Sequence, residues 1–131
     1  MVSPVFVVLC DYGLFDSWRR RVSAIGIFDY FSAAVFPTRL RFDVVSKWMA
    51  DEGGSEGDFM IRIVSPDRGG GQRSVLWSTP PERMVFDLFT RTATNTAHFD
   101  LQAPIAGDYQ IEFYFNGELI HTKALPVIPE D

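Results

Sequence analysis

The feature that most limits what this chain can fold into is the segment 109–127, which has the pattern of a β-hairpin. Its first half alternates apolar and other residues at a period of two, which places Tyr109, Ile111, Phe113 and Phe115 on one face of a strand. Asn116-Gly117 then supplies two residues that readily adopt positive φ, as a two-residue type I′ turn requires. Residues 119–127 return as the second strand. The end of the chain is therefore predicted to be antiparallel β-structure.

The rest of the chain repeats this pattern in short pieces. Residues 5–10 form a continuous β-branched and apolar run, which predicts a strand buried on both faces. Leu40, Phe42 and Val44 alternate with charged residues, which is typical of a strand with one buried face. In all, about nine short strands separated by turn residues are expected, a pattern typical of a Greek-key sandwich.

The predicted fold class is all-β, a single-domain antiparallel β-sandwich of Greek-key, immunoglobulin-like type that spans residues 1–131. A length of 131 residues fits one domain. Aromatic residues make up 15% of the chain, and they favour half-buried strands. The segment from Met84 to Thr90 stays open between strand and helix. Thr79 and Glu82 have the spacing of a helix capping box, whereas the alternation after Met84 favours a strand.

Charge and cysteine content narrow the partners and the compartment. A net charge of −5 argues against a nucleic-acid partner, because phosphate binding requires a clustered positive surface. The single cysteine, Cys10, leaves no internal disulfide and fits a reducing compartment. The apolar run 5–10 is too short to cross a membrane. We therefore expect a cytoplasmic protein with no membrane partner.

Several stretches resemble a family of small, uncharacterised bacterial proteins of unknown function. The matching residues are Leu9-Cys10-Asp11, Ala24-Ile25-Gly26-Ile27-Phe28-Asp29, Phe36-Pro37, Val64-Ser65-Pro66-Asp67, Gly107-Asp108-Tyr109 and Asn116-Gly117-Glu118. The resemblance spans most of the chain, and residues 69–97 are the least similar part. It implies a β-sandwich and cytoplasmic residence, and it brings no activity or catalytic residues.

Residues able to support catalysis or metal binding are few. Cys10 ends an apolar strand beside Asp11, which favours a buried and inert thiol. His98 and His121 are the only histidines, and no spacing with cysteine or aspartate indicates zinc. We therefore predict no enzyme, no cofactor and no metal. The loop from Asp51 to Asp58 holds four carboxylates among glycines, and whether it binds calcium stays open against a solvated connection.

The candidate binding residues are Trp18, Arg19, Arg20 and Arg21. An aromatic ring beside three guanidinium groups on a connection is suited to an anion, an acidic partner or a stacked ring. The chain also carries more aromatics than a small core needs, because Tyr30, Phe31, Trp77, Phe89 and Tyr114 cannot all point inward. Exposed aromatic surface is typical of an interface with a partner or with a second copy.

These observations rank three functions. The first is a non-catalytic protein-interaction or assembly module, with a protein partner or as a homodimer. The alternative is a ligand-binding module of the carbohydrate-binding type, because aromatic rows on a sandwich face can stack on sugars. An enzyme ranks last, because the sequence provides no convergent acid, base and nucleophile.

Overall fold

The computed structural model describes residues 1–130. The regular secondary structure of these residues consists of β-strands alone. The ten strands are β1 (Val2–Asp16), β2 (Arg21–Phe28), β3 (Phe31–Ala33), β4 (Thr38–Ala50), β5 (Glu56–Val64), β6 (Val75–Ser78), β7 (Glu82–Val85), β8 (Thr92–Ala103), β9 (Gly107–Phe115) and β10 (Glu118–Pro129). They form a four-stranded sheet in the order β2-β1-β4-β8 and a six-stranded sheet in the order β3-β10-β9-β5-β6, with β7 paired to β5. The predicted all-β class is confirmed, although β3 and β10 run parallel.

The chain forms two compact units, each assembled from three segments. Unit 1 comprises Met1–Phe28, Arg41–Gly57 and Met84–Asp100, and it contains β1, β2 and most of β4 and β8. Unit 2 comprises Asp29–Leu40, Asp58–Arg83 and Leu101–Asp131, and it contains β3, β6, β9, β10 and most of β5. That the chain is one domain stays a prediction.

Unit 1 has an aromatic core built on β4. The ring of Phe42 stacks on Phe99 of β8 with centroids 5.3 Å apart, and Phe28 of β2 meets Phe42 edge-on at 6.3 Å. Trp48 is fully buried, and its indole N–H donates to Ser46 Oγ across 2.9 Å, so the polar atom carried into the core is paired. The buried apolar residues of unit 1 are Leu9, Cys10, Phe42, Val44, Val45, Trp48, Ala50, Met84, Phe86 and Phe99.

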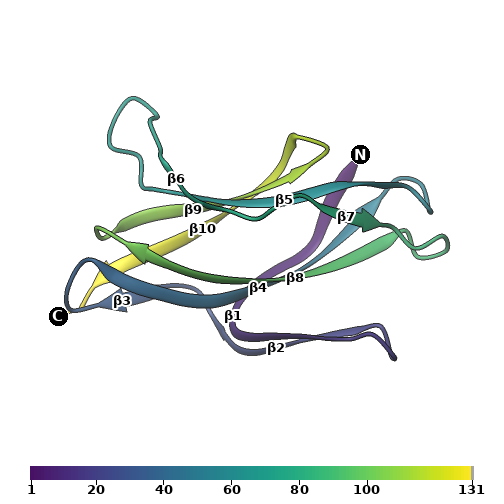
Figure 1. Ribbon diagram of the computed structural model, residues 1–131, viewed down its shortest axis with the longest axis horizontal. Coiled ribbons are helices and arrows are strands. Elements are labelled where there is room, and N and C mark those ends of the chain that lie inside the picture. The colour runs from purple at the N-terminus through teal and green to yellow at the C-terminus, as the bar shows by residue number, and fades with distance from the viewer. Residues whose placement is uncertain (131) are drawn as a thin grey trace. The chain divides into compact units, whose positions relative to one another are not determined.

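Strand β1 bends sharply along its length and continues as a long hairpin with β2 (Figure 1). Cys10 is the last β1 residue in register with β4, where it lies opposite Asp43. Beyond it, Gly26 of β2 has φ 73°, and a Cβ there would collide with the carboxylate of Asp11 on β1. Glycine at position 26 therefore permits the close approach of the two strands.

Unit 2 contains the hairpin from which the fold was predicted. Asn116 and Gly117 have φ of 52° and 78°, and they connect β9 to β10 as the expected turn. At the start of β9, the Tyr109 hydroxyl donates to Ile105 O across 2.7 Å and accepts from Ile105 N at 3.3 Å. A tyrosine bonded to backbone a few residues upstream is the arrangement called a tyrosine corner in immunoglobulin-type sandwiches. It fixes the turn that leads into β9.

One sequence prediction, the burial of residues 5–10, needs correction. Residues 5–10 were predicted to be buried on both faces, but Val5 and Phe6 are exposed and complete burial is reached only at Leu9 and Cys10. The pairing of β1 with β4 is irregular between Pro4 and Phe6, so the strand enters the core late.

The open segment from Met84 to Thr90 is neither strand nor helix along its length. Strand β7 ends at Val85, and a turn follows in which the Asp87 carboxylate accepts two backbone N–H groups. Because the Asp87 carboxylate bonds these N–H groups, they need no partner from a helix or a strand.

Candidate functional site

The turn between β1 and β2, here called the hairpin turn (residues 16–20), presents the side chain of Trp18 almost entirely to solvent. Asp16 Oδ1 accepts from the backbone N–H groups of Trp18 at 3.0 Å and Arg19 at 3.2 Å. The aspartate thus supplies the acceptors that this short connection lacks. Trp18 is 92% exposed, and Arg20 takes the left-handed φ of 54° that returns the chain into β2.

The turn between β7 and β8, here called the second turn (residues 87–91), is built in the same way. Asp87 Oδ1 accepts from the N–H groups of Phe89 at 2.8 Å and Thr90 at 2.9 Å. Phe89 is 89% exposed, beside an exposed Leu88, and Arg91 has φ 60°.

The two turns, together called the turn pair, therefore share one sequence pattern and one geometry. Each reads Asp-x-aromatic-x-Arg: Asp16-Ser17-Trp18-Arg19-Arg20 and Asp87-Leu88-Phe89-Thr90-Arg91. In each, one carboxylate oxygen holds the second and third following N–H groups, the aromatic projects, and arginine occupies the left-handed position. Left-handed φ disfavours residues other than Gly, Asn and Asp by about 1 kcal/mol or more, so arginine is not what turn geometry alone would select.

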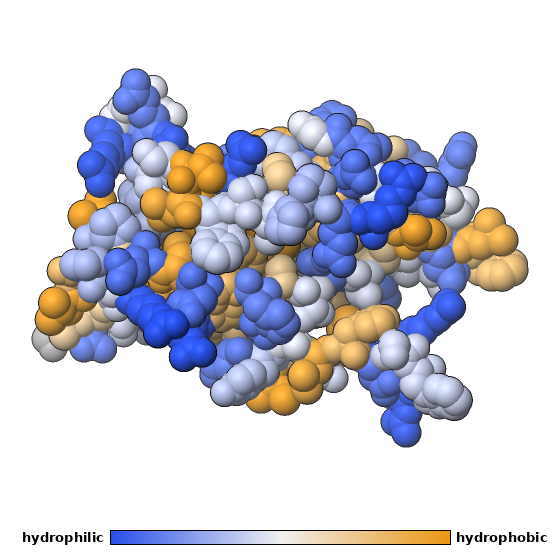
Figure 2. Space-filling view, in the orientation of Figure 1, coloured by the Kyte–Doolittle hydropathy of each residue, from blue (hydrophilic) through white to orange (hydrophobic). Residues whose placement is uncertain are grey.

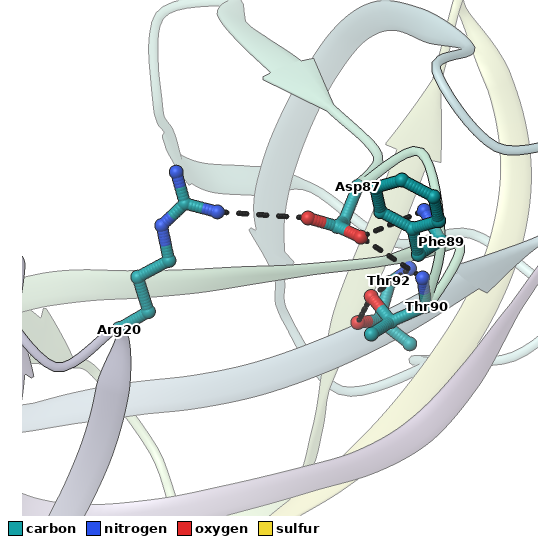
Figure 3. A network of polar contacts seen from close by, with 5 residues as sticks. All are labelled: Arg20, Asp87, Phe89, Thr90 and Thr92. Carbon is teal, nitrogen blue, oxygen red and sulfur yellow. Dashed lines mark hydrogen bonds and ion pairs between the residues drawn. The ribbon is translucent and has the colours of Figure 1, made fainter.

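An ion pair joins the two turns. Arg20 Nη1 lies 3.5 Å from Asp87 Oδ2, so the hairpin turn reaches the second turn across 67 positions of sequence (Figure 3). The backbone N–H groups of Thr90 and Phe89 are the main reason that the Asp87 pKa is lowered, and Arg20 adds a smaller effect. Asp87 therefore stays ionised, with one oxygen committed to its own turn and the other directed to Arg20.

The far part of the β1–β2 hairpin is held against β4 and β8 by Gly13 and Asp43. The Gly13 N–H donates to Asp43 Oδ2 across 2.7 Å, and a Cβ on Gly13 would lie 2.6 Å from Val45 Cγ2 and 2.7 Å from Thr96 Cγ2. The Asp43 side chain is only 10% exposed, and its Oδ1 lies 2.6 Å from His98 Nδ1. Both carboxylate oxygens are thus paired, which a buried aspartate requires.

An apolar face extends from the hairpin turn along the hairpin. Tyr12 and Ile25 are cross-strand neighbours, and with Leu14 and Ile27 they alternate onto one face of the β1–β2 ribbon. All four are more than half exposed. Hydrophobic side chains also project over the second turn at the right-hand end of Figure 2, and hydrophilic ones lie between that turn and the hairpin turn.

The two remaining candidate groups for catalysis or metal binding are the Cys10 thiol and the His121 ring. Cys10 is fully buried and its Sγ donates to Asp43 O at 3.7 Å. The predicted burial of Cys10 is confirmed, and burial, then the charges of Asp43 and Asp11, raise the pKa of its thiol. Burial and then Lys123 lower the pKa of His121, whose ring lies 5.9 Å from Phe113.

The acidic loop from Asp51 to Asp58 directs its carboxylates to different partners. Asp51 Oδ2 accepts from the N-terminal ammonium of Met1 at 2.8 Å, and Asp58 lies 3.7 Å from Arg83. Within residues 1–130, no group of three or more His, Cys, Asp or Glu side chains is placed to hold a metal ion. Whether the loop binds calcium stays open.

The structure brings Arg20 together with Asp87, a residue that the sequence reasoning missed. Arg19 is exposed on the hairpin turn and Arg21 is exposed at the start of β2, and Phe89 was noted only as a surplus aromatic. The missed contribution is the second turn around Asp87, and the repeated Asp-x-aromatic-x-Arg pattern was the signal for it. Tyr30 and Trp77 are also exposed, so the expectation that the aromatics cannot all point inward is confirmed.

The model of a family described as "Family of unknown function (DUF6941)" matches residues 5–128, and the chain belongs to that family. No curated protein matches the chain. Across the described residues, no helix is long and apolar enough to span a membrane.

Two solved structures resemble the chain distantly. An immunoglobulin-like protein from Pseudomonas aeruginosa is 16% identical with a TM-score of 0.43, over 97% of this chain and 96% of that one. A protein from Bacillus anthracis proposed to be a lipoprotein is 12% identical with a TM-score of 0.42, over 90% of this chain and 84% of that one. Likenesses this distant carry no conclusion about function.

Proposed function

We propose that this member of a family of unknown function is a non-catalytic protein-interaction module. Its contact surface would be the turn pair together with the apolar outer face of the β1–β2 hairpin. The observation that carries the proposal is the matching construction of the two turns, each of which presents one aromatic side chain, Trp18 or Phe89, almost fully to water.

Exposed aromatic and arginine side chains are what protein interfaces use most. Trp, Tyr and Arg are enriched among the residues that dominate binding energy, and aromatics are enriched in interface cores. Trp18, Phe89 and the arginines of the turn pair fit that composition. Each aromatic stands on a turn whose backbone is held by an aspartate, so little backbone conformational entropy remains to be lost on binding.

The size of the surface also suits a protein. A stable interface buries roughly 800 Å² on each partner, more than two turns provide. The outer face of the hairpin extends the apolar area through Tyr12, Leu14, Ile25 and Ile27. Exposed apolar surface that is continuous over several side chains is characteristic of contact sites.

Affinity capture followed by direct binding tests the proposal. The purified wild-type chain, the double variant Trp18→Ala/Phe89→Ala and the control Trp77→Ala are each used to capture proteins from a lysate of the source organism. A protein retained by the wild type and the control but not by the double variant is then purified, and its Kd is measured for all three. We expect the double variant to weaken binding by at least ~10-fold, about 1.4 kcal/mol. Equal affinity for the wild type and the double variant would contradict the proposal.

Light scattering distinguishes a different protein from a second copy. If the partner is a second copy, the wild-type mass doubles with rising concentration and the Trp18→Ala/Phe89→Ala variant stays monomeric. If the partner is a different protein, both remain monomers and only the mixture with that protein gains mass. A dimer that the variant leaves intact would place self-association elsewhere.

A further inference from the structure

The turn pair is basic on a chain that is acidic overall. The two turns and Arg21, the first residue of β2, contain four arginines (Arg19, Arg20, Arg21 and Arg91) against the carboxylates of Asp16 and Asp87, whereas the whole chain carries a net charge of −5. Each of the two carboxylates already has one oxygen bonded to the backbone of its own turn. Arg91 donates to the backbone O of Asp51 in the acidic loop, and its charge acts on the Asp51 carboxylate, so the excess positive charge is concentrated on Arg19, Arg20 and Arg21.

The ion pair between the turns is open to replacement. The Arg20 side chain is 81% exposed, and its 3.5 Å contact with Asp87 is of the exposed kind that contributes little to stability. Asp87 holds the second turn through Oδ1 and meets Arg20 through Oδ2. A carboxylate from a partner can therefore approach Arg20 without loosening either turn.

We infer that the partner contacts the turn pair through an acidic segment in which carboxylates flank an apolar residue; this inference rests on the proposed function. The carboxylates meet the arginines of the hairpin turn, with Arg able to form paired hydrogen bonds to a carboxylate. The apolar residue packs against the exposed ring of Trp18 or Phe89. A peptide chain can follow the β1–β2 hairpin from the turns along Tyr12 and Ile25, which are exposed cross-strand neighbours.

Selection from a random library of 12-residue displayed peptides tests this chemistry. The full-length protein is the bait, and enriched peptides are synthesised and their Kd is measured. The variants are Trp18→Ala/Phe89→Ala and Arg19→Ser/Arg20→Ser/Arg21→Ser, and the matched control is Arg68→Ser/Trp77→Ala, an exposed arginine and tryptophan in unit 2.

We expect enriched peptides with net negative charge and an apolar residue. Both turn variants should bind at least ~10-fold more weakly, the control should match the wild type, and affinity should fall from 50 to 300 mM salt by roughly 10-fold.

The outcomes separate this inference from the proposed function. Peptides without excess negative charge that need the aromatics but not the arginines would overturn the acidic partner and leave the interaction module standing. Peptides that bind the turn variants as well as the wild type would overturn both. The third outcome is that no peptide is enriched and the protein binds phosphatidylcholine vesicles that contain phosphatidylglycerol, in a Trp18-dependent way, but not vesicles of phosphatidylcholine alone. That outcome would overturn the acidic segment and assign the surface to an anionic membrane.

Discussion

The backbone N–H of Gly13 donates to the buried carboxylate of Asp43 across 2.7 Å, and this bond ties the β1–β2 hairpin to the strand beneath it. Backbone pairing between β1 and β4 ends at Cys10. Beyond that point, the bond from Gly13 to Asp43 attaches the hairpin to β4 in place of the hydrogen bonds between paired strands. The hairpin carries Trp18 and Arg20 at its end. The bond between Gly13 and Asp43 therefore helps to fix the position of the hairpin and of the candidate surface at its end.

Replacing Gly13 with alanine should loosen this anchor. The added Cβ would lie 2.6 Å from Val45 Cγ2 and 2.7 Å from Thr96 Cγ2, well inside van der Waals contact. We expect the free energy of unfolding to fall by about 1–3 kcal/mol, the usual cost of overpacking. Urea unfolding monitored by tryptophan fluorescence measures it. An unchanged midpoint would show that the hairpin does not pack as closely as described.

Asp43→Asn should cost more than His98→Ala. The asparagine loses charge-assisted bonds to both Gly13 and His98, and we expect a loss of about 1–3 kcal/mol. Removing the His98 ring, which is 74% exposed, lets water reach Asp43 Oδ1 and leaves the Gly13 bond in place, so it should cost less than Asp43→Asn. The comparison uses urea unfolding and the hydrogen-exchange rate of the Gly13 amide. Faster exchange in His98→Ala than in Asp43→Asn would contradict this assignment.

Arg20→Asn should separate stability from binding. Asparagine tolerates the φ of 54° that strains arginine, so relief of up to about 1 kcal/mol offsets the loss of the exposed ion pair to Asp87. We expect an unchanged or raised Tm together with weaker partner binding, the trade-off typical of functional positions. Calorimetry and a binding titration on the same preparation test it. A lowered Tm with unchanged affinity would assign Arg20 a structural role.

Acid should loosen the second turn only at unusually low pH. The N–H groups of Thr90 and Phe89, with Arg20 contributing less, hold the pKa of Asp87 below its ordinary value. A depressed folded-state pKa stabilises the fold above the ordinary value, and that contribution is lost as pH falls through the folded pKa. Carboxyl NMR should show Asp87 titrating below the reference value of 3.8. A midpoint at or above that value would mean that the turn bonds are absent in solution.

The features that the sequence predicted correctly are those that depend on neighbouring residues alone. Asn116-Gly117 specifies its own turn, and the alternation from Tyr109 to Phe115 specifies a strand, because both depend on adjacent residues. The contact of Arg20 with Asp87 joins positions 67 apart, and no local pattern predicts it. The segment after Met84 was ambiguous because alternation describes side-chain faces and does not reveal that the Asp87 carboxylate closes a turn.

The central claim, that the turn pair is the contact surface, is tested most directly by fluorine NMR of the chain labelled with 5-fluorotryptophan. The chain has three tryptophans: Trp18 is exposed on the hairpin turn, Trp48 is buried in unit 1, and Trp77 is partly exposed in unit 2. Addition of the captured partner should shift or broaden the Trp18 resonance and leave those of Trp48 and Trp77 unchanged. A shift of Trp77 with Trp18 unmoved would contradict the claim.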